Sequence, residues 1–168
     1  MAIAVSGRVQ LRNLVVDLLA EQYPAVAKDL LNPLAELMQV ARKACGDDAD
    51  KFLILLVIGV RTAQDQRFSE LTNDELENNP VGVLPSLGTN TRSISDSTGI
   101  PKETVRRKLT ELTQAGWIVR EGNDLLLTCK AYQELVTVRD SIRSLAIRNW
   151  ETVSGLITTR EEPPSIPG

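Results

Sequence analysis

Apolar residues recur at three- and four-residue steps over much of the chain, a spacing typical of amphipathic helices. The first such stretch covers 7–21, and Pro24 is expected to end or kink that helix. A second helix is expected to start at Pro33, after the good capping residue Asn32, and to reach about Cys45. Both helices are apolar enough that we expect them to pack on the rest of the chain or on a second copy of it.

The most apolar stretch, FLILLVIGV over 52–60, lies in a helix predicted over 49–67. Asp48 or Asp50 can cap its start. A β-strand is the competing interpretation of a β-branched run, but the flanking sequences DADK and RTAQDQR favour a helix. Because the stretch is apolar on all sides, we expect it to be the most buried helix of the protein.

Residues 68–89 mix polar helix formers with turn residues and are long for a plain loop. A short helix over 72–77 and an extended piece near 81–84 are predicted. The segment is either an exposed linker or a loop that binds a ligand or partner.

The carboxy-terminal part begins with a hairpin pattern, in which two short strands flank a Gly-Asn turn within 119–128. Thr128 can cap a long last helix over 129–150. Its apolar positions are Ala131, Leu135, Val138, Ile142, Leu145 and Trp150. This stripe is longer than a small core can cover, so part of it is expected to contact another subunit. The Pro-rich end, within 155–168, is expected to be disordered.

The stretch 90–128 places a short polar helix, a tight turn, a basic helix and the hairpin in succession. Asn90 can cap the first helix. Gly99 can adopt the left-handed conformation that turns the chain into the next helix, whose first turn suits Pro101. Its core-facing side chains are predicted to be Val105, Leu109 and Leu112. This order indicates a helix-turn-helix with a wing, whose common use is to place a helix in the major groove of DNA.

The outward side of the basic helix carries side chains suited to reading DNA. Arginine can bind guanine through two hydrogen bonds and glutamate can accept one from cytosine, whereas a lysine near the helix start suits a phosphate. Arg92 and Lys108 lie at the edges, where backbone contacts are expected. Arg120 and Asn123 on the hairpin could reach the minor groove or its phosphates. The predicted DNA-binding residues are Arg92, Lys102, Glu103, Arg106, Arg107, Thr110, Arg120 and Asn123.

The distribution of charge supports this interpretation more than its sum. The net charge of the 168 residues is -3, which by itself argues against nucleic acid. Residues 91–120, however, carry 6 basic and 3 acidic side chains, whereas 1–90 carry 8 and 12, and 121–168 carry 5 and 7. The only positive block is therefore the predicted reading segment. An acidic body with a basic reading segment is compatible with a specific DNA binder of modest non-specific affinity.

Candidate chemistry elsewhere is sparse. The chain has no histidine, and its two cysteines, Cys45 and Cys129, match no metal-ligand spacing and are expected to be buried apolar thiols. The usual general base is therefore missing, and there is no Gly-rich phosphate loop. We expect no enzyme activity, no metal and no cofactor. No apolar run reaches about 18 residues, and 1–5 lacks the features of a secretion signal, so a cytoplasmic location without membrane contact is expected.

The sequence TGIPKETVRRKLTELTQAGWIV, residues 98–119, resembles winged helix-turn-helix transcriptional regulators, and the resemblance extends over about 52–128. With helices on both sides, the chain is similar to the MarR family, in which terminal helices of two subunits interlock. The resemblance implies a mainly α fold with a small β-hairpin wing, flanked by N- and C-terminal dimerisation helices. Two departures are a short wing without a long Asp- and Arg-rich tip, and an extra segment between Phe68 and Asn90.

We therefore expect a homodimeric, sequence-specific regulator that binds double-stranded DNA, with a recognition helix over about 101–114. The expected organisation is N-terminal helices over 1–46, a DNA-binding domain over 47–128, a C-terminal dimerisation helix over 129–154 and a tail over 155–168. The alternative is a winged-helix module that binds another protein and no DNA. The operator, the direction of regulation and the existence of a small-molecule effector stay open at this level.

Overall fold

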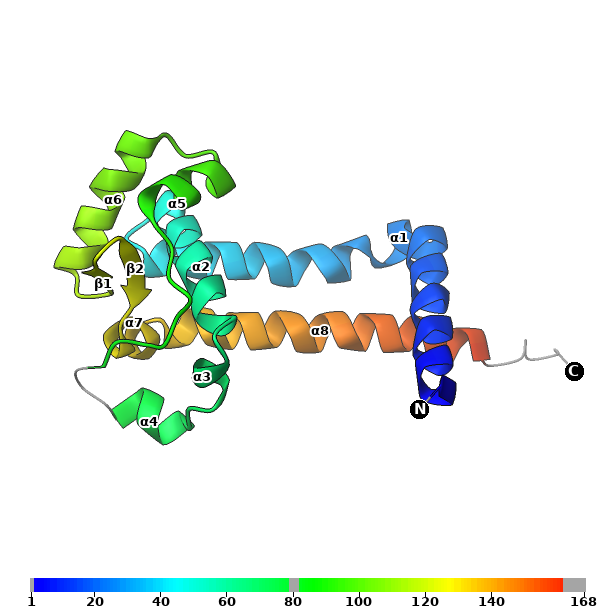
Figure 1. Ribbon diagram of the computed structural model, residues 1–168. Coiled ribbons are helices and arrows are strands. Elements are labelled where there is room, and N and C mark those ends of the chain that lie inside the picture. The colour runs from blue at the N-terminus through cyan, green and yellow to red at the C-terminus, as the bar shows by residue number, and fades with distance from the viewer. Residues whose placement is uncertain (1, 79–81, 162–168) are drawn as a thin grey trace, which may run out of the picture. The chain divides into compact units, whose positions relative to one another are not determined.

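The computed structural model describes residues 2–78 and 82–161, and the side chains from residue 7 onward. This part of the chain is mainly helical and contains a two-stranded antiparallel sheet (Figure 1). The elements in order are α1 (Ala2–Ala44), α2 (Ala49–Ala63), α3 (Gln66–Ser69), α4 (Asn73–Asn78), α5 (Thr91–Thr98), α6 (Lys102–Gln114), β1 (Ile118–Glu121), β2 (Asp124–Leu127), α7 (Cys129–Glu134) and α8 (Val136–Glu161). Among the described residues, no helix combines the length and the apolar character needed to cross a membrane.

The chain divides into two compact units. One contains the residues up to Leu37 together with those from Asp140 onward, and the other is Met38–Arg139. In the first unit Leu18 and Leu156 are buried, and the guanidinium of Arg148 donates to Glu36 at 2.6 Å. This unit is held by few buried side chains, and much of its apolar surface stays exposed.

The prediction of two separate amino-terminal helices is wrong. The chain from Ala2 to Ala44 forms one helix, with Pro24 and Pro33 inside it. A proline in a helix removes one backbone hydrogen bond and bends the axis without necessarily ending the helix. Figure 1 shows a sharp change of direction along α1, as expected of a kinked helix.

The last helix also differs from its prediction. The chain leaves helical geometry at Leu135 (φ -90°, ψ 23°), so that α7 ends there and α8 begins at Val136. Thr128 caps α7 as expected, by accepting from the backbone N–H of Ala131 at 3.2 Å. Helix α8 then continues to Glu161, so the first part of the expected disordered tail, 155–161, is helical. The rest of that tail, 162–168, lies outside the described residues.

Helix α2 lies at the centre of the second unit. Asp48 caps it as predicted, by accepting from the backbone N–H of Lys51 at 3.1 Å. Its buried side chains are Phe52, Ile54, Leu55, Ile58 and Thr62. Burial on all sides, however, is not observed, because one side of the helix is 37–47% exposed at Leu53, Leu56 and Val60. An apolar stretch thus fills the core with one face only.

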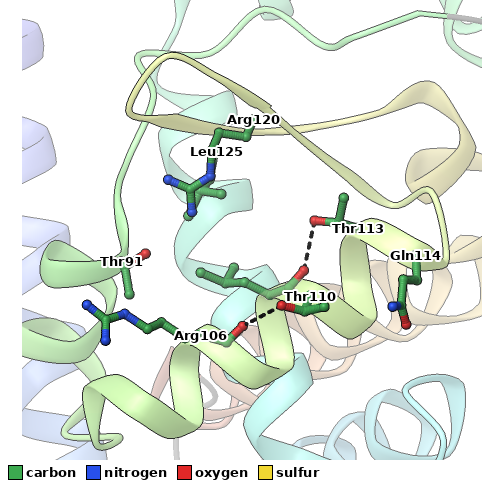
Figure 2. Close-up of a pocket in the computed structure, with 8 residues that line it drawn as sticks. Thr91, Arg106, Thr110, Thr113, Gln114, Arg120 and Leu125 are labelled. Carbon is green, nitrogen blue, oxygen red and sulfur yellow. Dashed lines mark hydrogen bonds between the residues drawn. The ribbon is translucent and has the colours of Figure 1, made fainter.

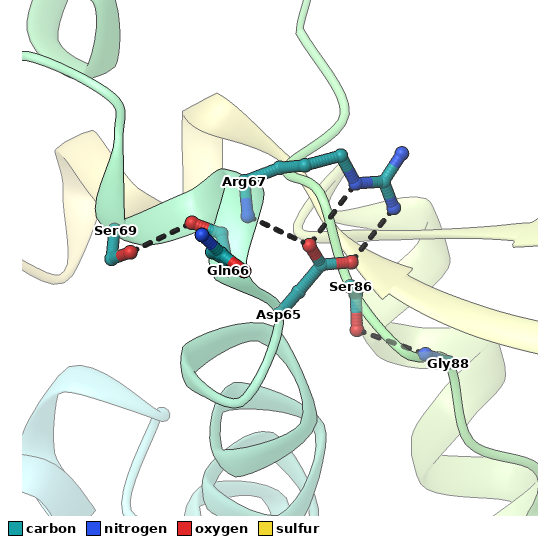
Figure 3. A network of polar contacts seen from close by, with 6 residues as sticks. All are labelled: Asp65, Gln66, Arg67, Ser69, Ser86 and Gly88. Carbon is teal, nitrogen blue, oxygen red and sulfur yellow. Dashed lines mark hydrogen bonds and ion pairs between the residues drawn. The ribbon is translucent and has the colours of Figure 1, made fainter.

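The helix expected to reach residue 67 ends earlier because Asp65 starts a new one. The Asp65 carboxylate accepts from the backbone N–H of Arg67 at 3.0 Å and from its guanidinium at 3.0 and 2.7 Å (Figure 3). Nearby, the backbone N–H of Gly88 donates to the Ser86 hydroxyl at 3.1 Å. Asp65 is only 5% exposed, so this capping residue belongs to the buried interior of the fold.

The described residues of this segment, 68–78 and 82–89, are not an exposed linker. Helix α4 lies close to where a short helix was predicted. Leu76, Leu84 and Cys129 form a buried cluster, against which Phe68, Leu71, Leu127 and Tyr132 pack.

The extended piece that follows α4 pairs with the end of the hairpin. Leu84 N–H donates to Leu127 O at 2.8 Å, and Cys129 N–H donates to Gly82 O at 2.8 Å. Leu125 N–H donates to Thr89 O at 2.7 Å. The extended conformation predicted near 81–84 is therefore confirmed for 82–84, whereas residue 81 lies outside the described residues.

The stretch from α5 to the hairpin follows its sequence closely. Asn90 accepts from the backbone N–H groups of Arg92 and Ser93, both at 3.0 Å. Gly99 ends α5 in the left-handed region with φ 73°, and Lys102 begins α6. The predicted core face of α6 is confirmed, since the exposed fractions of its members are 0–4% at Val105, Leu109 and Leu112. Strands β1 and β2 pair from Ile118↔Leu127 to Glu121↔Asp124.

Replacing Gly99 with alanine should lower the free energy of unfolding by about 1–2 kcal/mol, because a Cβ is strained in the left-handed region. Gly59 is the matched control. It lies inside α2, where an added Cβ would be 3.8 Å from Leu127 Cδ1, so Gly59→Ala should stabilise by about 0.5–1 kcal/mol. Denaturant unfolding followed by the fluorescence of Trp117, in a Trp150→Phe background that leaves it as the only tryptophan, measures both. Changes of the same sign in the two variants would contradict the assigned conformations.

Candidate nucleic-acid interface

The outward side of α6 is as the sequence predicts. Glu103, Arg106, Arg107 and Thr110 are all exposed. The guanidinium of Arg106 donates to the Glu103 carboxylate at 3.0 Å, and the hydroxyl of Thr110 donates to Arg106 O at 3.1 Å. An ion pair this exposed contributes little to stability, so the Arg106 guanidinium is available to a ligand at low cost.

A cavity of about 510 Å³ lies between α6 and the hairpin; we call it the helix–hairpin cavity. Its lining residues are Thr91, Arg106, Leu109, Thr110, Thr113, Gln114, Arg120 and Leu125 (Figure 2). Figure 2 shows Arg120 reaching from the hairpin toward α6 and Arg106 on the α6 side. Leu109 and Leu125 are 4% and 1% exposed and form an apolar floor. Two guanidinium groups and three threonine hydroxyls thus surround a floor that belongs to the core.

A second cavity, of about 280 Å³, joins the starts of α5 and α6 to the hairpin turn; we call it the basic cavity. It is lined by Asn90, Thr91, Arg92, Lys102, Arg120 and Asn123. Three of these side chains are cationic and none is a carboxylate. The Arg92 guanidinium is 3.7 Å from the Asp96 carboxylate, and both groups are largely exposed. Thr91 and Arg120 line both cavities, so the two adjoin.

The structure brings most of the predicted DNA-binding residues together. Arg106, Thr110 and Arg120 line the helix–hairpin cavity, and Arg92, Lys102, Arg120 and Asn123 line the basic cavity. Glu103 and Arg107 line neither, although both are exposed on α6.

Sequence reasoning did not select Thr91 and Thr113 as site residues. Helical spacing could have found Thr113, which is three residues beyond Thr110 and seven beyond Arg106 on the same side of the helix. Thr91 comes from another helix, so only the fold brings it to α6.

Lys108 does not lie where a contact with the DNA backbone was expected. Its ammonium pairs with the Asp48 carboxylate at the start of α2, and both side chains are more than four-fifths buried. Beside this pair, Lys51 Nζ lies 2.6 Å from Glu111 Oε2. Two ion pairs therefore join α6 to α2, away from the outward side of α6.

The pKa values of these carboxyl groups follow from their partners. Burial alone would raise the pKa of Asp48, but the hydrogen bonds from Lys108 and from the Lys51 backbone, with the two positive charges, hold it below its usual value. The hydrogen bond from Lys51 lowers the pKa of Glu111, and that same bond raises the pKa of Lys51. Asp48, Lys51 and Glu111 are therefore charged at neutral pH.

Both cysteine thiols are buried and free, as predicted. Burial raises the pKa of both, that of Cys45 to about 11. Because the thiolate is the reactive form, neither sulfur is activated. Within the described residues, no three histidine, cysteine, aspartate or glutamate side chains gather closely enough to hold a metal ion.

Comparisons of the chain with family models, with curated protein sequences and with solved structures find no match.

Proposed function

We propose that this chain is a homodimeric, sequence-specific DNA-binding regulator of transcription, in which α5, α6 and the hairpin act as a winged helix-turn-helix. The observation that carries the proposal is the pair of adjoining cavities around α6, which four cationic side chains and no carboxylate line in a protein of net charge -3. A duplex offers phosphates to such a surface and base edges to the helix beside it. MarR-like regulators are the class that this arrangement resembles.

In this proposal α6 enters the major groove and the two cavities have different roles. Arg106 and Thr110 reach base edges from α6, and an arginine there favours guanine. Lys102, Arg92 and Arg120 contact phosphates from the basic cavity, which fixes the position of α6 on the duplex. Glu103 and Arg107 are exposed on the part of α6 that lines neither cavity, where they can read bases beyond those that Arg106 reaches. The hairpin turn is only two residues, Gly122 and Asn123, so the wing has a supporting part.

Exposed apolar side chains of the first unit support self-association. On α1, Val9, Val16 and Tyr23 recur every seven residues and are each about half exposed, at 49–56%. On α8, Ile142 and Trp150 are 43% and 65% exposed. Apolar surface of this extent marks an interaction site, and a symmetric dimer is the commonest way to cover it. Two copies of α6 would then read half-sites about one helical turn apart.

Selection from a random duplex pool, followed by titration against salt, tests the proposal. A palindromic sequence should be enriched. If Arg92, Lys102 and Arg120 of both subunits neutralise phosphates, the logarithm of affinity should fall with the logarithm of salt concentration with a slope of about -5. No enrichment, together with no duplex binding at low salt, would contradict DNA binding.

The second candidate function is a module that binds another protein. The exposed apolar side of α2, formed by Leu53, Leu56 and Val60, favours it. Such a module would show no duplex binding at low salt, and its partner contacts would depend on this side of α2. Replacing Leu56 with glutamate should then abolish partner binding, whereas in a DNA-binding regulator the same change should leave duplex affinity within about twofold.

A further inference from the structure

Two ion pairs join the start of α2 to α6, and their charges match in only one relative position of the two helices. The order along α2 is negative at Asp48 and positive at Lys51, and the order along α6 is positive at Lys108 and negative at Glu111. Lys108 and Glu111 are three residues apart on α6 and therefore share one side of that helix, whereas Asp48 is the capping residue that precedes α2, three residues before Lys51. A shift of α6 by one turn would place like charges opposite each other, which is unfavourable. The pairs therefore distinguish the observed register from its nearest alternatives.

On α6, Lys108 lies opposite Arg106 and Thr110, and Glu111 lies to one side of them. At about 100° per residue, Lys108 is about 160° from each of the two, whereas Glu111 is about 140° from Arg106 and about 100° from Thr110. The core face of the helix, formed by Val105, Leu109 and Leu112, packs against the rest of the unit on another side. Helix α6 is thus held by apolar packing on one side and by two ion pairs with Asp48 and Lys51 on another.

Burial makes the Asp48–Lys108 pair sensitive to the loss of one partner. The side chains of Lys108 and Asp48 are 13% and 18% exposed, compared with 57% and 84% for the Arg106–Glu103 pair on the outward side. Removing one member of a partly buried pair leaves an uncompensated charge, whereas an exposed pair is lost at little cost. The ion pairs that hold α6 against α2 are therefore less exposed to solvent than the pair on its outward side.

We propose that Asp48, Lys51, Lys108 and Glu111 form a positioning clamp, which sets the register and rotation of α6 and thereby its base preference. The inference rests on the proposed DNA-binding function. None of the four residues contacts DNA in this account; they act through the placement of Arg106 and Thr110. Asp48 also caps α2, so one side chain fixes both the start of α2 and the position of α6.

Charge exchange in the full chain tests the clamp. Lys51→Glu and Glu111→Lys each leave like charges face to face and should lower discrimination between the selected duplex and its single-base variants by about fivefold or more. The double variant K51E/E111K has the wild-type net charge and restores opposite charges. Its discrimination should exceed that of either single variant, because opposite charges again face each other, but should stay below that of the wild type, because charges of one sign on each helix no longer exclude a shift of α6 by one turn.

A second pair of variants introduces no like charges and is therefore expected to disturb the fold less. Lys108→Gln removes the ammonium, and Asp48→Asn removes the carboxylate charge but leaves a residue that caps helices well. Each should lower discrimination, the double variant should lose no more than either one, and the salt dependence should stay that of the wild type. A Lys108→Gln slope smaller by about one unit with unchanged discrimination would identify Lys108 as a phosphate contact instead and overturn the clamp.

The outcomes separate the clamp from the proposed function. A wild type that selects a duplex, with an exchanged double variant that is folded yet does not regain discrimination, overturns the clamp alone. A wild type that binds no duplex overturns the proposed function and the clamp with it. Unchanged discrimination in all four single variants also overturns the clamp, because a purely structural role would change thermal stability only.

Discussion

Replacing Arg106 with alanine is expected to weaken binding to the selected duplex by about 1–3 kcal/mol and to relax the preference at one base position. Arg106 is the only cationic residue of α6 that lines the helix–hairpin cavity, and its guanidinium is engaged only by an exposed carboxylate. The two hydrogen bonds that it can offer to guanine are the source of discrimination. Competition titrations against single-base variants of the duplex measure both effects.

Variants of two other basic residues serve as controls for this prediction. Arg143 is an exposed arginine of the first unit that pairs with Asp140, so Arg143→Ala should leave affinity within about twofold. Lys102→Ala, in the basic cavity, should weaken all duplexes alike and reduce the salt slope by about one unit per subunit. Equal loss of specific and non-specific binding in Arg106→Ala would contradict its role as a base reader.

Replacing Ile94 with alanine is expected to lower the free energy of unfolding of the second unit by about 2–5 kcal/mol. Ile94 is fully buried and is the only buried residue of α5. Since α5 has no other buried side chain to hold it, the cavity left by the change cannot be filled from the same helix. DNA affinity should fall as well, because α5 supplies Thr91 and Arg92 to the basic cavity.

Fluorescence can isolate the unit that contains Ile94. The chain has two tryptophans, and Trp150→Phe leaves Trp117, whose indole N–H donates to Glu134 at 2.6 Å, as the only reporter. In this background Ile94→Val should cost only about 0.5–1.5 kcal/mol. Ser93→Ala, on the exposed side of α5, should stay within about 0.5 kcal/mol. A loss below 1 kcal/mol in Ile94→Ala would show that α5 is held by other contacts.

The features that the sequence predicted correctly are local ones. Asn90, Asp48 and Thr128 each cap the helix that they precede, because a short polar side chain needs only its own next residues to do so. Gly99 turns the chain for the same reason, since its conformation depends on one missing Cβ. The core side of α6 followed from spacing alone. The helices, the turn and the hairpin of residues 90–128 could therefore be predicted almost completely.

The features that were missed depend on contacts between distant residues. The sequence near Leu135 contains no proline or glycine, so nothing there predicted the break between α7 and α8. The pairing of Leu84 with Leu127 joins residues 43 apart in sequence, and no local pattern reveals such a partner. The role of Lys108 was misjudged because a basic residue on a helix looks alike in sequence whether it faces DNA or Asp48.

Arg120 lines both cavities around α6, and this has a consequence for energetics. Substitutions at Arg106 and Lys102 act in different cavities, and their effects on binding free energy should add if nothing links them. Arg120 is such a link, because one guanidinium faces both the base-reading and the phosphate-binding region. The interaction energy of a double-mutant cycle between Arg106 and Lys102 should therefore depend on whether Arg120 is present. In the proposed complex, a substitution of Arg120 should therefore change base discrimination and phosphate affinity together.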